Sequence, residues 1–141
     1  MTFKIKTITV KNFLSVGNQT QAVDFDKEHL TLVLGENLDL GGDDSGSRNG
    51  TGKTTMINAL SYALYGQALT NIRKENLINK TNAKAMLVTV EFEVGGTAYR
   101  IERGVLPSHL YKLDTGNLLI LMIQGLVTME SFLIYGWCDH Q

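Results

Sequence analysis

The stretch Asn49-Gly50-Thr51-Gly52-Lys53-Thr54-Thr55 predicts a phosphate-binding loop, and the expected fold is arranged around it. It follows a glycine-rich run and precedes an amphipathic segment, so we expect it to open a helix. The first-turn amides of a helix have no acceptor within it, and its positive dipole end attracts anions. Gly50 and Gly52 have no Cβ, which lets the loop adopt positive φ and bring its amides against phosphate oxygens.

Each residue type in this loop suits one part of a bound nucleoside triphosphate. Lys53 can reach the β- and γ-phosphates, the Thr54 hydroxyl can bind Mg²⁺, and the Thr55 hydroxyl can bond the α-phosphate. The common pattern G-x-x-x-x-G-K-[ST] would need glycine at Ser47, so only the form N-G-x-G-K-[ST]-[ST] is complete. The alternative is a glycine-rich surface turn that happens to contain a lysine, but an apolar strand before the loop and a helix after it favour phosphate binding.

The segment between Gly35 and Arg48 leaves two interpretations open. Either Gly35 fills the first-glycine position and the residues that follow are an insertion, or Gly46 or Ser47 fills it. Three aspartates at positions 39, 43 and 44 could suggest a metal site. No glutamate completes a calcium-loop pattern, however, so a solvated loop is the simpler interpretation.

The composition indicates one globular domain or part of one. The 141 residues are 43% hydrophobic, and a net charge of −1 provides no electrostatic footprint for nucleic acid. Cys138 is the one cysteine, so no internal disulfide is possible. No secretion signal is recognisable at the N-terminus, and polar residues dilute the apolar run 118–135, so we expect a cytoplasmic protein without a membrane span.

Hydrophobic periodicity predicts an α/β fold with a mixed sheet. The expected strands are 3–13, with a phase slip near Thr7, then 22–25, 30–34, 86–94 and 97–103, with Gly95-Gly96 as a hairpin turn. Strand 30–34 is nearly all apolar and is expected to be buried on both faces, as in a parallel sheet. The expected helix is 54–65, ended by Gly66, and a shorter helical stretch is expected within 70–79.

Charge divides the chain into two unlike parts. After Arg103 the charged residues are Lys112, Asp114, Glu130 and Asp139, and all the others precede it. We therefore predict a domain over 1–104 and an atypical charge-poor tail over 105–141. Truncation followed by non-native sequence would explain such a tail.

Several segments together resemble the N-terminal ATPase half of the SMC/SbcC group. The segments that carry the resemblance are 8–17, 49–55, 59–66, 77–79 and 99–104. The form of the phosphate loop and the long glycine- and aspartate-rich segment before it are most similar to the branch of tailed-phage recombination endonucleases. The resemblance spans about residues 3–104.

This resemblance implies a P-loop NTPase of the ATP-binding-cassette type, here its N-terminal lobe, which uses ATP and Mg²⁺. It implies that Asn49 to Thr55 bind the phosphates and Thr54 the metal, with Lys53 stabilising charge during hydrolysis. It places Asn12, Phe13 and Ser15 near the sugar and base. It further implies a homodimer of ATPase heads that acts with a nuclease subunit on DNA ends, in the host cytoplasm for a phage protein.

The sequence lacks several features that are typical of the SMC/SbcC group. It has no heptad repeat, no signature motif and no hydrophobic strand ending in Asp-Glu. We therefore expect weak nucleotide binding and negligible turnover from this chain alone. The alternatives are a small kinase-like P-loop enzyme, and an inactive fragment or binding module that holds no nucleotide.

Overall fold

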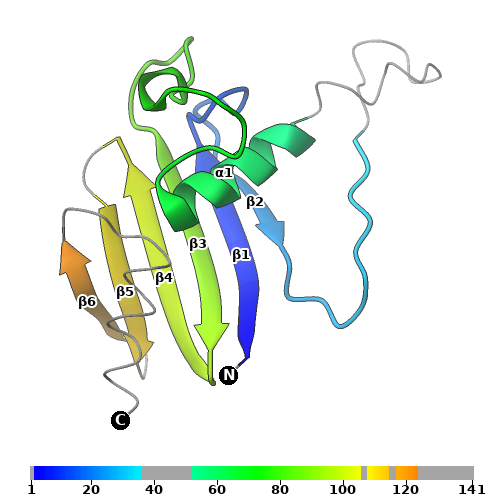
Figure 1. Cartoon of the computed structure of the whole chain (residues 1–141), viewed down its shortest axis with the longest axis vertical. Coiled ribbons are helices and arrows are strands. Elements are labelled where there is room, and N and C mark those ends of the chain that lie inside the picture. Colours follow the sequence, from blue (N-terminus) through cyan, green and yellow to red (C-terminus); the bar gives the residue numbers. More distant parts are fainter. Residues whose placement is uncertain (1, 36–51, 106–107, 115–116, 124–141) are drawn as a thin grey trace.

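A six-stranded antiparallel sheet crossed on one face by a helix makes up the described part of the chain (Figure 1). The computed structural model describes residues 2–35, 52–105, 108–114 and 117–123. In chain order the elements are β1 Phe3–Lys11, β2 Gln21–Asp24, α1 Lys53–Tyr65, the 3-10 turn η3 Lys74–Asn76, β3 Leu87–Val94, β4 Thr97–Gly104, β5 Ser108–Asp114 and β6 Asn117–Ile123. Across the sheet the strand order is β2-β1-β3-β4-β5-β6.

Strand β1 contains the predicted phase slip. Its register against β3 shifts between Ile5 and Thr7, where one residue is inserted as a bulge. A bulge inserts an extra residue into the alternation, so the apolar residues Ile5 and Ile8 can serve one face although they are three apart. Ile8 and Val10 are fully buried beneath α1.

The β3–β4 hairpin is confirmed. Gly95 and Gly96 both adopt positive φ, 55° and 83°, which a two-residue type I′ turn requires and glycine allows. The alternating apolar side chains of the two strands form the centre of the core: Val88, Val90, Phe92, Val94, Tyr99 and Ile101.

Helix α1 packs its apolar side across β1, β3 and β4. The expected helix over 54–65 is present, one residue longer at its start. Ala59, Tyr62 and Ala63 are fully buried against the sheet. Gly66 ends the helix with φ 78°, and its N–H donates to the carbonyl oxygen of Tyr62 at 2.8 Å.

Two predicted elements are wrong. Residues 30–34 form no strand, and Leu30, Leu32 and Leu34 are between 70% and 101% exposed. A buried strand needs hydrogen-bonding neighbours and a cover on each face. In the described sheet β2 is an edge strand that pairs with β1 alone, so residues 30–34 do not pair with it. The sheet of the described residues is therefore antiparallel throughout rather than mixed.

The helical stretch expected within 70–79 is reduced to the turn η3. The turn does not continue as a helix, because the backbone groups that follow it form hydrogen bonds with the loop after β1. The carbonyl of Leu77 accepts from the N–H of Leu14, and the N–H of Asn79 donates to the carbonyl of Asn12.

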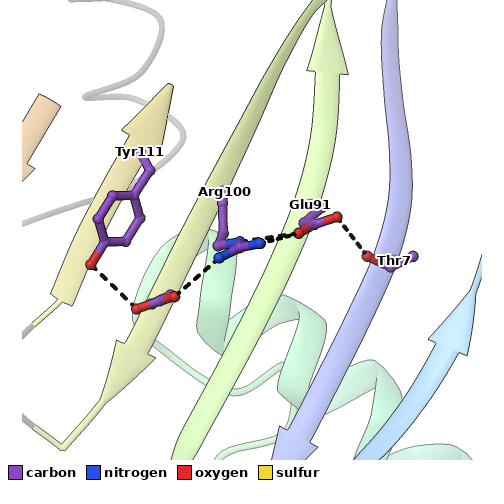
Figure 2. Close-up of polar contacts among 5 residues, drawn as sticks. Thr7, Glu91, Arg100 and Tyr111 are labelled. Carbon is purple, nitrogen blue, oxygen red and sulfur yellow. Dashed lines mark hydrogen bonds and ion pairs between the residues drawn. The ribbon is translucent and has the colours of Figure 1, made fainter. Parts of the chain in front are cut away.

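The sheet face opposite α1 carries a chain of polar contacts across four strands (Figure 2). Thr7 donates to Glu91, Arg100 bonds Glu91 at 2.7 Å and lies 3.7 Å from Glu102, and Tyr111 donates to Glu102. These charged side chains are about one-third exposed. Each such pair therefore contributes up to about 1 kcal/mol, and together they favour the observed strand register.

Strands β5 and β6 extend the same sheet beyond residue 104. The predicted boundary at 104 would therefore divide this sheet. Part of the apolar run expected over 118–135 forms β6, and its remainder lies outside the described residues.

The Tyr62 hydroxyl is a buried link between α1 and the end of β4. It donates to the carbonyl oxygen of Gly104 at 2.8 Å, and the Arg103 guanidinium lies 5.8 Å from the ring centroid. Burial raises the pKa of Tyr62, and the nearby Arg103 charge partly opposes that rise. The neutral phenol is thus favoured in the folded state.

We expect Tyr62→Phe to lower the free energy of unfolding by about 1–3 kcal/mol at neutral pH, because the Gly104 carbonyl loses its donor. Because the pKa of Tyr62 is higher in the folded protein than in the unfolded chain, the neutral phenol stabilises the fold. This stabilisation is fully present below the unfolded pKa of about 10 and is lost as the pH rises through the folded pKa. The variant should therefore lose less stability than the parent at alkaline pH. Urea unfolding at a series of pH values measures both effects, and equal alkaline slopes would contradict the second.

Candidate functional site

The N-terminus of α1 is where the structure places the described part of the predicted phosphate loop. Gly52 is the N-cap with φ 94°, and its carbonyl accepts the Met56 N–H at 3.0 Å. No described heavy atom beyond its chain neighbours lies within 4 Å of where a Cβ on Gly52 would sit. Glycine at the N-cap has no side chain to bond the first-turn amides, and no acidic residue stands in that turn. This helix end therefore suits an anion.

The three residues after Gly52 differ in exposure. Lys53 and Thr54 are exposed, whereas Thr55 is only 8% exposed. An exposed lysine and threonine at a helix start fit the expected contacts to phosphate oxygens and Mg²⁺. The other predicted loop residues, 49–51, lie outside the described residues, as do the three aspartates of the preceding segment.

Ser15 lies against the same helix end although it is forty positions away in the sequence. Its hydroxyl and that of Thr55 are 2.8 Å apart and share a hydrogen bond. A hydroxyl has one donor and two acceptor positions, so Thr55 keeps its hydrogen for a phosphate oxygen when Ser15 is the donor of this bond. The structure thus brings Ser15 together with Thr55 of the phosphate loop, and the predicted position of Ser15 near the sugar and base stays a prediction.

A cavity of about 820 Å³ opens beside these residues. This is a volume typical of small-molecule sites. Its polar lining side chains are Ser15, Asn18, Gln19, Gln21 and Lys53, and Gly52 lines it as well. Its apolar side comes from three separate segments: Val16, Val23, Phe25, Val33, Leu34, Met56 and Ile57. These apolar lining residues are called the apolar wall below, and Met56 and Ile57 contribute to it from the first turns of α1.

Asn12 and Phe13 do not line this cavity. Asn12 is fully buried, donates to Asn18 at 3.2 Å and accepts from Asn82 at 2.8 Å. Phe13 is also fully buried, with its ring centroid 5.8 Å from that of Tyr62. The structure thus gives both residues contacts within the fold, and their predicted contact with a nucleotide stays a prediction.

Sequence reasoning missed the apolar wall and the amide contacts behind Ser15. Met56 and Ile57 belong to the helix expected over 54–65, and both line the cavity. Asn18 and Asn82 were not singled out. The available signal was four asparagines, Asn12, Asn18, Asn79 and Asn82, because this residue type often bonds backbone groups close to it and tolerates left-handed φ.

Two negative findings apply to the described residues. Among them, no group of three or more His, Cys, Asp or Glu side chains is placed to hold a metal ion. No described helix combines the length and the apolar character needed to cross a membrane.

A family comparison matches residues 7–121 to an AAA domain. The matched segment includes the residues at the start of α1, the Ser15 loop, all of β2, β3, β4 and β5, and parts of β1 and β6. It covers well over half of the chain.

Individual relatives match part of the same segment. The exonuclease subunit 2 of Enterobacteria phage T4 is 35% identical over 106 residues, which is 75% of this chain and 17% of that protein. The DNA double-strand break repair Rad50 ATPase of Methanococcus maripaludis is 30% identical over 99 residues, 70% of this chain and 8% of that protein. A subunit of the nuclease SbcCD of Staphylococcus aureus strain MRSA252 is 37% identical over 59 residues, 40% of this chain and 6% of that protein. The chain thus spans less than a fifth of the length of these relatives.

Proposed function

Because the chain belongs to the AAA-domain family and is similar to the N-terminal region of SMC/SbcC-type ATPases, we propose that it binds ATP with Mg²⁺. It would do so as part of an ATPase in DNA double-strand-break repair or recombination. The observation that carries the proposal is the hydrogen bond between Ser15 and Thr55 beside a cavity of about 820 Å³ that Ser15 and Gly52 line. Residues from two distant segments converge there, which a mere surface turn would not require.

The residues present fit a triphosphate with its cation. The positive φ of Gly52 and the helix start behind it suit phosphate oxygens, and exposed Lys53 supplies a positive charge for the β- and γ-phosphates. Thr54 is the residue that would hold Mg²⁺. A bound cation neutralises charge on the transferred phosphoryl group, and Lys53 would stabilise the same charge. Asn49, Gly50 and Thr51 would complete the phosphate contacts.

Ser15 is the residue we assign to the sugar and base side of the nucleotide. Its hydroxyl lies at the cavity and bonds Thr55. Asn12 and Phe13 would contribute by shaping the loop that carries Ser15. The apolar wall that includes Met56 and Ile57 would adjoin the less polar part of the ligand.

Support for a wider assembly comes from the relatives, which are an exonuclease subunit, a nuclease subunit and a double-strand break repair ATPase. We propose that the intact protein forms a homodimer of ATP-binding-cassette heads and acts with a nuclease subunit on DNA ends, in the cytoplasm of a phage host. Residues 1–104 would be the N-terminal half of the head. The charge-poor residues 105–141 would be an atypical tail, whose first part adds β5 and β6 to the sheet.

Calorimetric titration of the 141-residue chain with Mg-ATP tests the proposal. We expect weak but measurable binding, together with phosphate release no faster than in a protein-free control, because the acidic motif that activates water is absent from this sequence. Rapid ATP hydrolysis by the chain alone would contradict the expectation of negligible turnover. Phosphoryl transfer to a nucleoside monophosphate would indicate a kinase instead, and absence of binding heat at several temperatures would indicate a module without nucleotide.

A further inference from the structure

The loop that carries Ser15 contains two residues in a conformation that L-amino acids rarely adopt. Asn12 has φ 50° and Leu14 has φ 48°, on either side of the buried Phe13. Left-handed backbone is strained at a non-glycine residue, at leucine more than at asparagine, and persists only where the surrounding structure determines it. The position of Ser15, directly after Leu14, therefore depends on contacts outside this loop.

Those contacts come from the segment Leu77–Asn82. The N–H of Leu14 donates to the carbonyl of Leu77 at 2.7 Å, and the N–H of Asn79 donates to the carbonyl of Asn12 at 2.8 Å. Phe13 and Ile78 form a short antiparallel bridge between them. The backbone of both strained residues is thus bonded to a segment more than sixty positions away.

Two asparagine side chains complete the attachment. The Asn79 amide donates to the carbonyl of Leu14 at 2.8 Å, and its oxygen accepts the N–H groups of Thr81 and Asn82 at 3.1 and 3.0 Å. This turn places the Asn82 amide 2.8 Å from the side-chain oxygen of Asn12. A buried amide such as that of Asn12 is costly unless it is bonded, so Asn82 fixes the start of the loop.

The far end of the loop is held through Asn12. Its side chain donates to Asn18, and its backbone N–H donates to the carbonyl of Gly17 at 2.9 Å. Gly17 and Asn18 both line the cavity, as Ser15 does, whereas Asn79 and Asn82 do not. Any effect of these two asparagines on a ligand must therefore pass through the loop.

We propose that Asn79 and Asn82 are positioning residues for the nucleotide site, which hold the Ser15 hydroxyl against Thr55. The inference rests on the proposed ATP binding. Loss of the Asn82 amide would release Asn12 and let the strained loop relax. Ser15 would then leave Thr55, and the polar side of the cavity would lose its geometry.

A double-mutant cycle on the 141-residue chain tests this, with the dissociation constant for Mg-ATP measured by calorimetry. We expect Asn82→Ala to raise the constant about 3- to 10-fold, as for one lost hydrogen bond. In a Ser15→Ala background, the same change should raise it less than about 1.5-fold, because the residue through which Asn82 acts is gone. Asn76→Ala is the matched control, since this exposed asparagine lies on the adjacent turn η3.

Each outcome of the cycle has one meaning. Equal effects of Asn82→Ala in both backgrounds, or no effect while Lys53→Ala weakens binding, would overturn the positioning role and leave the proposed function standing. Absence of Mg-ATP binding by the parent chain would overturn both. Circular dichroism shows whether each variant is folded, and Asn82→Leu, which keeps the approximate shape, lacks the donating amide and adds no charge, supplies the same cycle where Asn82→Ala does not fold.

Discussion

Replacing Phe13 with alanine is expected to lower the free energy of unfolding by about 3–5 kcal/mol, the range for truncating a buried aromatic side chain. The Phe13 ring is fully buried against Tyr62, and its backbone bridges to Ile78. A cavity at this point would loosen α1 and the Ser15 loop together. Urea unfolding followed by circular dichroism measures the change.

Two further variants make the Phe13 result specific. Phe3→Ala is the matched control, because Phe3 is 44% exposed at the start of β1 and should lose much less stability. Phe13→Leu keeps most of the apolar volume, so it should retain the fold and bind Mg-ATP within about twofold of the parent. A stable Phe13→Leu variant with tenfold weaker binding would contradict a purely structural role and support the predicted base contact.

The parts of the fold that sequence could predict are those decided by neighbouring residues. Strand β1 was predictable with its slip near Thr7, because alternation of side chains is local and a bulge shifts it visibly. The β3–β4 hairpin was predictable because two glycines between alternating strands meet the backbone requirement of a tight turn. The end of α1 at Gly66 follows from the same local chemistry.

The parts that could not be predicted depend on distant partners. The run 30–34 has the composition of a buried strand, but burial requires neighbouring strands and a cover, and composition does not show whether these exist. The bridge between Phe13 and Ile78 could not be predicted either, because no residue near Phe13 in the sequence indicates it. Within the predicted site, the start of α1 could be predicted from a local motif. The placement of Ser15 could not, because it depends on the distant residues 77–82.

Lys53→Ala is expected to weaken Mg-ATP binding by about 1.5–3 kcal/mol, the cost of losing a charged hydrogen bond. This corresponds to a dissociation constant roughly 10- to 150-fold higher. Lys53 directly follows Gly52 at the start of α1 and lines the cavity, so its charge adjoins the place where the phosphates would lie. Calorimetric titration of parent and variant measures the ratio.

The nucleotide series separates a phosphate contact from a general effect of charge. If Lys53 contacts the β- and γ-phosphates, Lys53→Ala should weaken ATP strongly and change AMP binding little, because AMP lacks both groups. Lys74→Ala removes an equal charge from the exposed turn η3 and should leave ATP binding within about twofold. Lys53→Arg should bind less tightly than the parent although it keeps the charge, because the planar guanidinium does not reproduce a compact ammonium. Equal losses for ATP and AMP, or an unchanged ATP affinity in Lys53→Ala, would remove Lys53 from the phosphate site and weaken the case for ATP binding at this helix.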